Sequence, residues 1–310
     1  MIGYVVLRLG RAVVVMLVLT LTVFIVVSAS GDPVRIMLPP YAGEQDVAAM
    51  RHALGLDRPW AVQYLTFLGH ALRGDLGRSI TYRQPVLPLV LQFFPATLEL
   101  AFTALAISVV VGIPLGVAAA IHEGTPIDGL AMTLGVTGRT VPGFWLGILL
   151  ILLFSVTLRW LPTSGRGGIA HLILPGITLA TTFVAEIVLM VRAGMLDVLR
   201  EDYVRTARAK GMPSRIVHYR HALRNALIPV ITLIGVRFGT LMGGAVITEA
   251  VFSWPGVGML AASAVYARDF PLVSASVILL AVWIVLANLV VDLAYALMDP
   301  RVSYERRATR

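Results

Sequence analysis

The sequence predicts an all-α membrane protein with six transmembrane helices. Of its 310 residues, 58% are hydrophobic and only 14% are charged. A soluble domain, in contrast, is about half apolar and about one quarter charged. The apolar residues are also grouped in long uncharged blocks, which is typical of membrane spans.

The first block, residues 12–29, contains no charged residue and follows Arg8 and Arg11. It is long enough to cross a bilayer core of about 30 Å. A cleavable signal peptide would share the basic start, but this apolar run is longer than that of a typical signal. We therefore expect residues 1–30 to form a retained transmembrane helix with the N-terminus in the cytoplasm.

Residues 31–94 differ from the rest of the chain. They are rich in proline, and between residues 31 and 95 six arginines are nearly balanced by five acidic residues. The positive-inside rule therefore does not hold this segment in the cytoplasm. Apolar residues recur with helical spacing at 48–54 and 60–72. We expect a partly helical extracytoplasmic loop subdomain, which could cap the helix bundle, dock a partner, or do both.

Five more blocks predict the other transmembrane helices. We assign residues 95–299 to one transmembrane domain and residues 300–310 to a cytoplasmic tail. A kink is expected at Gly112, Pro114 and Gly116, in the first of these helices. The predicted spans are 100–121, 140–158, 172–191, 225–248 and 271–291.

Basic residues define the orientation in the membrane. Between residues 192 and 224 there are eight basic and three acidic residues, and the tail carries four arginines. The positive-inside rule places both segments in the cytoplasm. Six spans that start from a cytoplasmic N-terminus give the same result.

The predicted cytoplasmic loop covers residues 196–228. A strongly polar segment, 201–229, makes up most of this loop and reaches into the next predicted span. Residues 198–210 have helical periodicity, with Leu199, Tyr203 and Ala207 four residues apart. Gly211 should stop this helix or allow a turn, and Pro213 suits the first turn of a second helix. We call this helix–glycine–helix segment the elbow. It could enter a cleft in a soluble partner or lie on anionic lipid, and its tyrosine and small residues favour protein contact.

The elbow resembles the cytoplasmic coupling loop of ABC importer permeases, in the dipeptide/oligopeptide/nickel branch. The sequence similarity in the elbow covers residues 203–211 and 220–229. Residues 205–207 stand where the general motif has Glu-Ala-Ala, so no role of a glutamate at that step is carried over. The long loop after the first helix resembles the first permease of a pair. Other similar stretches are 54–59, 74–80, 95–100, 248–258 and 299–301.

This resemblance implies a type I ABC importer permease fold in a bacterial inner membrane. It implies a permease that forms half of a path for di- or oligopeptides, or a related solute. The implied partners are a substrate-binding protein, a homologous second permease, one or two ABC ATPase subunits and the lipid bilayer, with no nucleic acid. The ATPase-coupling residues implied are Glu201, Asp202, Tyr203, Val204, Arg205, Thr206, Ala207, Arg208, Ala209, Lys210 and Gly211.

The sequence does not predict an enzyme. A P-loop needs a lysine after its second glycine, but Lys210, the only lysine, follows Ala209. ATP and Mg²⁺ are therefore expected on partner ATPase subunits, with no cofactor on this chain. The absence of cysteine excludes disulfides and zinc–thiolate sites. His218 and His221 alone are a weak metal signal beside basic neighbours, so no metal or catalytic residue is predicted.

Polar residues near or within the predicted spans are candidates for the translocation path. Such residues usually face the bundle interior, because a charge in the hydrocarbon core is unfavourable. They could instead form structural pairs, for example Arg237 with Glu186 or Glu99. An ion relay through Arg237 and Glu186 would make the chain a secondary carrier or channel, which is the alternative to an importer. The candidates are Glu99, Arg139, Glu186, Arg237, Asn288 and Asp292.

Overall fold

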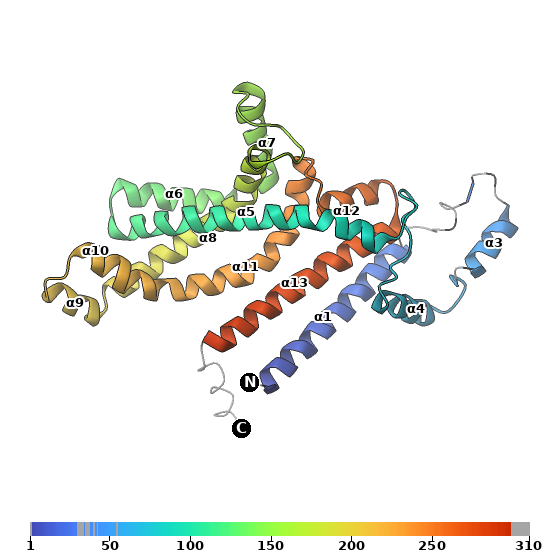
Figure 1. Cartoon of the computed structure of the whole chain (residues 1–310), viewed down its shortest axis with the longest axis horizontal. Helices are drawn as coiled ribbons and strands as arrows, with labels where there is room; N and C mark the ends of the chain where they lie inside the picture. Colours follow the sequence, from blue (N-terminus) through green and yellow to red (C-terminus); the bar gives the residue numbers. More distant parts are fainter. Residues whose placement is uncertain are drawn as a thin grey trace. The chain divides into compact units, whose positions relative to one another are not determined.

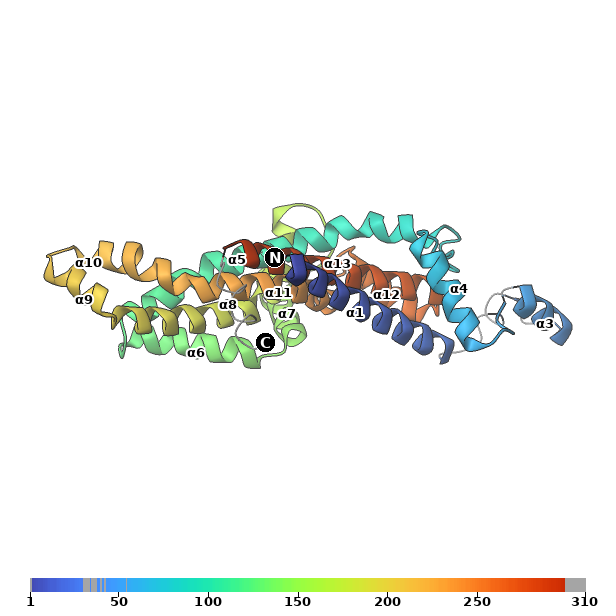
Figure 2. The ribbon, with the colours of Figure 1, turned by 90° about the horizontal axis from the view of Figure 1, so that it is seen from below.

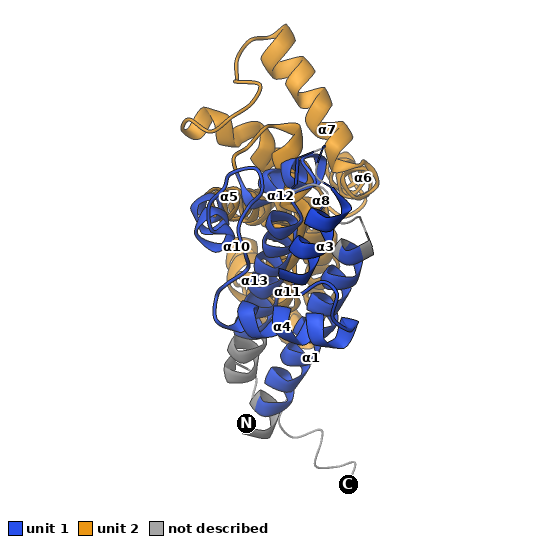
Figure 3. Cartoon of the chain, turned by 90° about the vertical axis from the view of Figure 1, so that its right-hand side faces the viewer, with its two compact units in different colours: residues 1–95, 256–310 blue, residues 96–255 orange. Residues whose placement is uncertain are grey.

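Helices form nearly all of the regular structure. The computed structural model describes residues 2–29, 34, 38–39, 41, 43–53 and 55–298. Over these residues, the only pairing outside helices is an isolated antiparallel bridge between Arg78 and Pro85. The chain divides into two compact units, residues 1–95 with 256–310 and residues 96–255 (Figure 3).

The first unit is built on two long apolar helices, α1 (Ile2–Ala29) and α13 (Phe270–Met298), which pack against each other (Figure 1). The short helix α12 (Val257–Tyr266) also packs on α13. Helix α1 contains the first predicted span, and α13 contains the last. For Asp292 and the residues that follow it in α13, the structure describes only the backbone.

The loop after α1 is partly helical, as predicted. It contains α3 (Glu44–Ala53) and α4 (Trp60–Leu72). The ring of Phe24 on α1 contacts the rings of Trp60 and Tyr64 on α4 at centroid distances of 6.1 and 5.6 Å. The hydroxyl groups of Thr20 and Tyr64 are hydrogen-bonded at 3.0 Å. Apolar and polar contacts thus attach α4 to α1.

A buried carboxylate connects two distant segments of the same unit. Asp269, just before α13, is fully buried. Its Oδ2 accepts hydrogen bonds from the hydroxyl of Ser79 and from the backbone N–H of Thr81, the latter at 2.9 Å. Burial raises the pKa of Asp269, but these hydrogen bonds outweigh that effect and hold the pKa below its ordinary value. The ionised carboxylate therefore stabilises the segment around Ser79 and Thr81 against the start of α13.

Replacing Asp269 with alanine should destabilise this unit by about 1–3 kcal/mol, because the buried Ser79 hydroxyl and the partly buried Thr81 N–H lose their acceptor. Since the folded-state pKa is lowered, the contribution of Asp269 is fully present above its unfolded value, near 3.8, and is lost as the pH falls through the lower folded value. Thermal unfolding of wild type and variant across this range tests the prediction. Asp57→Ala, at an exposed carboxylate, is the control, and equal melting temperatures for all three proteins would contradict it.

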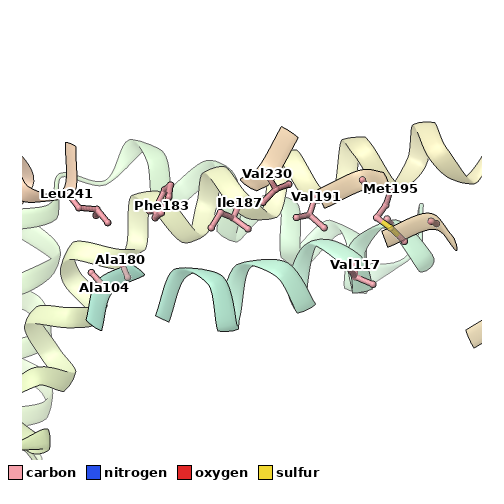
Figure 4. Close-up of a cluster of buried hydrophobic side chains, with 12 residues drawn as sticks. Ala104, Val117, Ala180, Phe183, Ile187, Val191, Met195, Val230 and Leu241 are labelled. Carbon is pink, nitrogen blue, oxygen red and sulfur yellow. The ribbon is translucent and has the colours of Figure 1, made fainter. Parts of the chain in front are cut away.

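The second unit is organised around α8 (Ile169–Leu199). It packs against α6 (Pro126–Thr140), α7 (Gly143–Leu150) and α11 (Leu223–Val251), and α8 and α11 run side by side (Figure 2). One face of α8 supplies a row of buried residues to the core, including Phe183, Ile187 and Val191 (Figure 4). This core also receives side chains from α5 (Val86–Ile121) and α11.

Two glycines allow α5 to lie very close to α8. A Cβ placed on Gly112 would lie 2.8 Å from Ile187, and one on Gly116 would lie 2.7 Å from Val191. Small residues four apart permit such close backbone packing between membrane helices. The predicted kink residues therefore have a packing function in the structure.

The third predicted span, 140–158, is occupied by α7 and the π-helical segment that continues it, η1 (Ile151–Thr157). A separate helix that was not predicted, α6, precedes it and ends at Thr140, and the two helical segments meet at a bend of 108°. Pro142 lacks an N–H group and disfavours the helical conformation of the residue before it, so Val141 is extended. The described residues contain five helices long enough to cross a membrane, or six if the bent pair counts as one span.

The helix that contains the second predicted span begins earlier than that span. The block 100–121 lies inside α5, which already begins at Val86 and contains Pro95. Pro88 lies in the first turn of α5, where the missing N–H has no intrahelical acceptor to lose. The helix therefore starts before the uncharged block does.

Candidate functional site

The elbow is the first candidate site, and it lies at one end of the second unit (Figure 1). We predicted one helix over 198–210, which is wrong in its start: α8 continues to Leu199 and a new helix, α9, covers Asp202–Ala209. Glu201 between them is extended, with φ −68° and ψ 146°, and is the N-terminal cap residue of α9. The chain thus changes direction before Tyr203.

A small apolar core holds the elbow together. Val204, Ala207 and Val217 are buried and pack with Val198 and Leu199. The predicted buried face is therefore correct for Ala207 but wrong for Tyr203, which is 42% exposed. The Tyr203 hydroxyl instead accepts a hydrogen bond of 2.7 Å from the Nδ2 group of Asn225, at the start of α11. This contact links α9 to the helix that continues into the bundle.

Gly211 makes the turn of the elbow. Its φ of +74° lies in the left-handed region, and its N–H donates to the Arg208 carbonyl at 2.9 Å. Pro213 precedes rather than enters the first turn of α10 (Ser214–Ile216). The helix then passes through a π-helical segment, η2 (Val217–Ala222), into α11 without a break, which confirms the predicted continuation.

The surface of the elbow is polar, and over residues 201–211 it exposes three basic and two acidic side chains. Asp202 and Arg205 form an ion pair of 3.5 Å, with both side chains highly exposed, so this pair contributes little stability. The exposed residues of the predicted coupling segment are Glu201, Asp202, Tyr203, Arg205, Thr206, Arg208, Ala209, Lys210 and Gly211. A rigid surface of this kind can contact a partner, but it has no arrangement for bond chemistry.

The second candidate site is a cavity of about 470 Å³ within the second unit. Glu186 on α8 and Arg237 on α11 lie in its wall, and the Arg237 Nη2 group donates to Glu186 Oε1 at 2.6 Å. Two partners, Glu186 and Glu99, were considered for Arg237, and in the structure Arg237 pairs with Glu186. The remaining lining residues are mainly apolar groups and threonines: Pro142, Gly143, Phe144, Thr178, Leu179, Thr182, Phe183, Thr240, Leu241, Gly244, Ile247 and Thr248.

The other predicted path residues lie elsewhere. Glu99 pairs with Arg166 at 2.6 Å, and Arg139 is exposed near the end of α6. Asn288 belongs to α13 in the first unit, and its Oδ1 atom is buried without a hydrogen-bond partner among the described residues. The side chain of Asp292 lies outside the described residues. Among the members of this set whose side chains the structure describes, Glu186 and Arg237 alone line the cavity.

Sequence reasoning missed a bidentate ion pair between Asp128 and Arg192. The Nε and Nη2 groups of Arg192 donate to the two carboxylate oxygens at 2.6 and 2.7 Å, and the Gly124 N–H donates to Asp128 Oδ2 at 3.0 Å. This contact joins the start of α6 to α8. Asp128 follows Pro126 in the first helical turn, a position typical of acidic residues, and this pattern was the available signal.

Two family models together match nearly the whole chain. Residues 112–304 match the binding-protein-dependent transport system inner membrane component, and residues 1–101 match the N-terminal region of the same membrane component. The chain belongs to this family. The resemblance of the elbow to ABC importer permeases is therefore confirmed by matches that extend far beyond the elbow.

Curated relatives cover this permease from end to end. The glutathione transport system permease protein GsiC of Salmonella paratyphi A is 42% identical over 306 residues, which are 98% of this chain and 100% of the relative. The di/tripeptide transport system permease protein DppB of Pseudomonas aeruginosa is 42% identical over 341 aligned positions, with 99% and 100% coverage. The GsiC protein of Escherichia coli K12 is 40% identical over 306 residues.

Solved structures share the permease fold. A structure of the inward-facing MetNI methionine ABC transporter has a TM-score of 0.54 and 19% identity, covering 66% of this chain and 93% of that one. An amino acid ABC transporter solved with histidines has a TM-score of 0.51 and 19% identity, covering 69% and 94%. The predicted all-α type I importer fold is thus confirmed. The chain is a multi-pass permease subunit of an ABC importer, a membrane component whose ATPase activity lies in separate subunits.

Proposed function

We propose that this permease forms half of the translocation path for di- or oligopeptides, or for a related peptide such as glutathione. The end-to-end similarity to glutathione and di/tripeptide permeases carries this proposal. An extracytoplasmic substrate-binding protein delivers the solute, and a homologous second permease supplies the other half of the path. Both termini and the elbow lie in the cytoplasm of a bacterial cell, and the inner membrane holds the complex.

The elbow is the contact with the ATPase in this proposal. Its small core and the turn at Gly211 make it a short rigid lever, and its exposed basic side chains suit an acidic groove. ATP and Mg²⁺ bind one or two partner ATPase subunits, whose closure moves the elbow. Nucleotide binding thereby biases a bundle with two states of access.

Uptake and assembly together test the proposed function. The permease, expressed together with a second permease and ATPase subunits, should co-purify with them and drive ATP-dependent peptide uptake into proteoliposomes when the binding protein is supplied. An ion-coupled carrier would instead take up solute with this chain alone, driven by an ion gradient. Uptake by the isolated chain without any ATPase would overturn the proposal.

Charge reversal on the elbow should weaken the ATPase contact. The double variant Arg205→Glu and Arg208→Glu is expected to lower the affinity for the ATPase about tenfold or more, because complementary surface charges become repulsive. Size-exclusion chromatography of the complex at low and high salt measures the effect. The variant with lysine at both positions keeps the charge and should assemble nearly as wild type. Unchanged assembly and transport after reversal would instead indicate a loop that only contacts lipid.

A further inference from the structure

The cavity beside Glu186 and Arg237 has the chemistry of a ligand site. We propose that it binds the two charged ends of a short zwitterionic peptide, with Glu186 holding the ammonium group and Arg237 the carboxylate. This inference rests on the proposed function and assigns a step of selection to the permease itself. It requires only residues of the second unit, from α7, α8 and α11.

Glu186 supplies the end that recognises an ammonium group. Its side chain is only 12% exposed, and its Oε1 atom accepts the hydrogen bond from Arg237. Its Oε2 atom is buried and has no hydrogen-bond partner among the described residues. A buried carboxylate oxygen without a donor is unfavourable, and buried polar groups usually have partners. Rotation of the carboxylate away from Arg237 would bring a Glu186 oxygen into the cavity, where an ammonium group would provide the missing donor together with a compensating charge.

Arg237 and the start of α7 supply the opposite end. The Arg237 side chain is 42% exposed, and its guanidinium has five N–H groups, of which the contact with Glu186 uses one. Gly143 and Phe144, in the first turn of α7, also line the cavity. Amide groups in the first turn of a helix have no intrahelical acceptors and favour an anion. Arg237 therefore supplies the donors for a carboxylate, and the start of α7 lies in the wall of the same cavity.

The ion pair gives the site a way to exchange partners. Without a ligand, Glu186 and Arg237 neutralise each other. When a zwitterion enters, each residue gains a ligand group of opposite charge, so no buried charge is left uncompensated. A ligand with one blocked end would leave one member of the pair without such a partner. The site therefore selects for peptides with both ends free.

The size and the lining of the cavity agree with this ligand class. Its volume of about 470 Å³ falls within the range of about 300–1,000 Å³ that is usual for small-molecule sites. Apart from the ion pair, the wall consists of apolar side chains, glycines and threonines such as Thr182 and Thr240. Such a wall accepts varied small side chains without specifying one, whereas the two charges specify the ends.

Saturation-transfer NMR on the assembled complex without binding protein tests the proposal, with alanylalanine, its N-acetyl derivative and its amide as probes. Wild type should bind alanylalanine about tenfold more tightly than either derivative, because each derivative loses a charge-assisted contact. Glu186→Gln should remove the preference over the N-acetyl derivative and keep the preference over the amide. Arg237→Gln should do the reverse. Glu99→Gln, which breaks the ion pair with Arg166 away from the cavity, is the matched control.

This end-specific pattern separates a ligand site from a structural ion pair. A structural role predicts that both variants change assembly in the same way and leave the ratio between the probes unchanged. Equal binding of the three probes to wild type would overturn the inference even if neither variant assembles. Peptide uptake by a wild-type complex that shows no end preference would overturn only the inference. Binding of the zwitterion without any peptide uptake would overturn only the proposed function.

Discussion

The Gly211→Val variant is expected to assemble with the ATPase but to lose most of its coupled transport. Gly211 has a φ of +74°, and a Cβ at this position would meet no atom within 4 Å. The substitution therefore creates no collision, and its effect comes from the backbone alone. A left-handed conformation costs about 1–2 kcal/mol for a residue with a side chain, and more for a β-branched one.

A cost of this size changes the population of the native turn about tenfold. Since α9 and α10 meet at this turn, the loss should appear as ATP hydrolysis without uptake. The ratio of peptide transported to ATP hydrolysed in proteoliposomes measures it. Gly211→Asn is the matched control, because asparagine tolerates the left-handed region far better than valine. Equal ratios for valine, asparagine and glycine would show that the turn geometry does not transmit force.

A second large effect is expected for Gly116→Ala, at the contact between α5 and α8. The new Cβ would lie 2.7 Å from the Cβ of Val191 and 2.8 Å from the backbone oxygen of Val188. A backbone atom cannot give way as the end of a flexible side chain can, so the two helices must separate. Overpacking of this kind costs about 1–3 kcal/mol. The melting temperature of the detergent-solubilised complex should fall accordingly.

The matched control is Gly129→Ala on α6. It also lies within a helix, but a Cβ there has no atom within 4 Å. Alanine is favoured over glycine in helices by about 1 kcal/mol, so this variant should be as stable as wild type or slightly more stable. A fall in melting temperature of the same size in both variants would indicate a general intolerance of substitution and not the close approach of α5 to α8.

Hydropathy predicted the helices much better than their ends. The blocks at 172–191 and 225–248 lie inside α8 and α11, yet α8 extends to Leu199 and the helix that contains α11 starts at Ser214. Backbone hydrogen bonds do not stop where the hydrocarbon core ends. A window of uncharged residues therefore locates a span but not the helix that carries it. The helix before the bend at Pro142, α6, was missed for the same reason, because Asp128 and Arg139 leave it without a long uncharged block.

The candidate sites were predictable to different degrees. The turn at Gly211 could be predicted from the local sequence, since a glycine between a helical segment and a proline is typical of a helix end followed by a new helix. The partner of Arg237 could not be predicted in this way, because Glu186 and Glu99 were equally plausible until the rotation of α8 against α11 was known. Tyr203 was assigned to the buried face on spacing alone, whereas the core of the elbow is centred on Val204 and Val217. Pairing across helices depends on their relative rotation, which periodicity within one helix does not determine.

The bend between α6 and α7 also has a consequence for biosynthesis. The two helical segments beside the bend, 126–140 and 143–157, have fifteen residues each. At about 1.5 Å per residue, each segment is about 22 Å long, which is less than the roughly 30 Å of a bilayer core. Neither half can therefore hold a place in the membrane alone as it leaves the ribosome. Both halves pack against α8, which supplies the missing support. We therefore expect α6 and α7 to become stable in the bilayer only after α8 has been made.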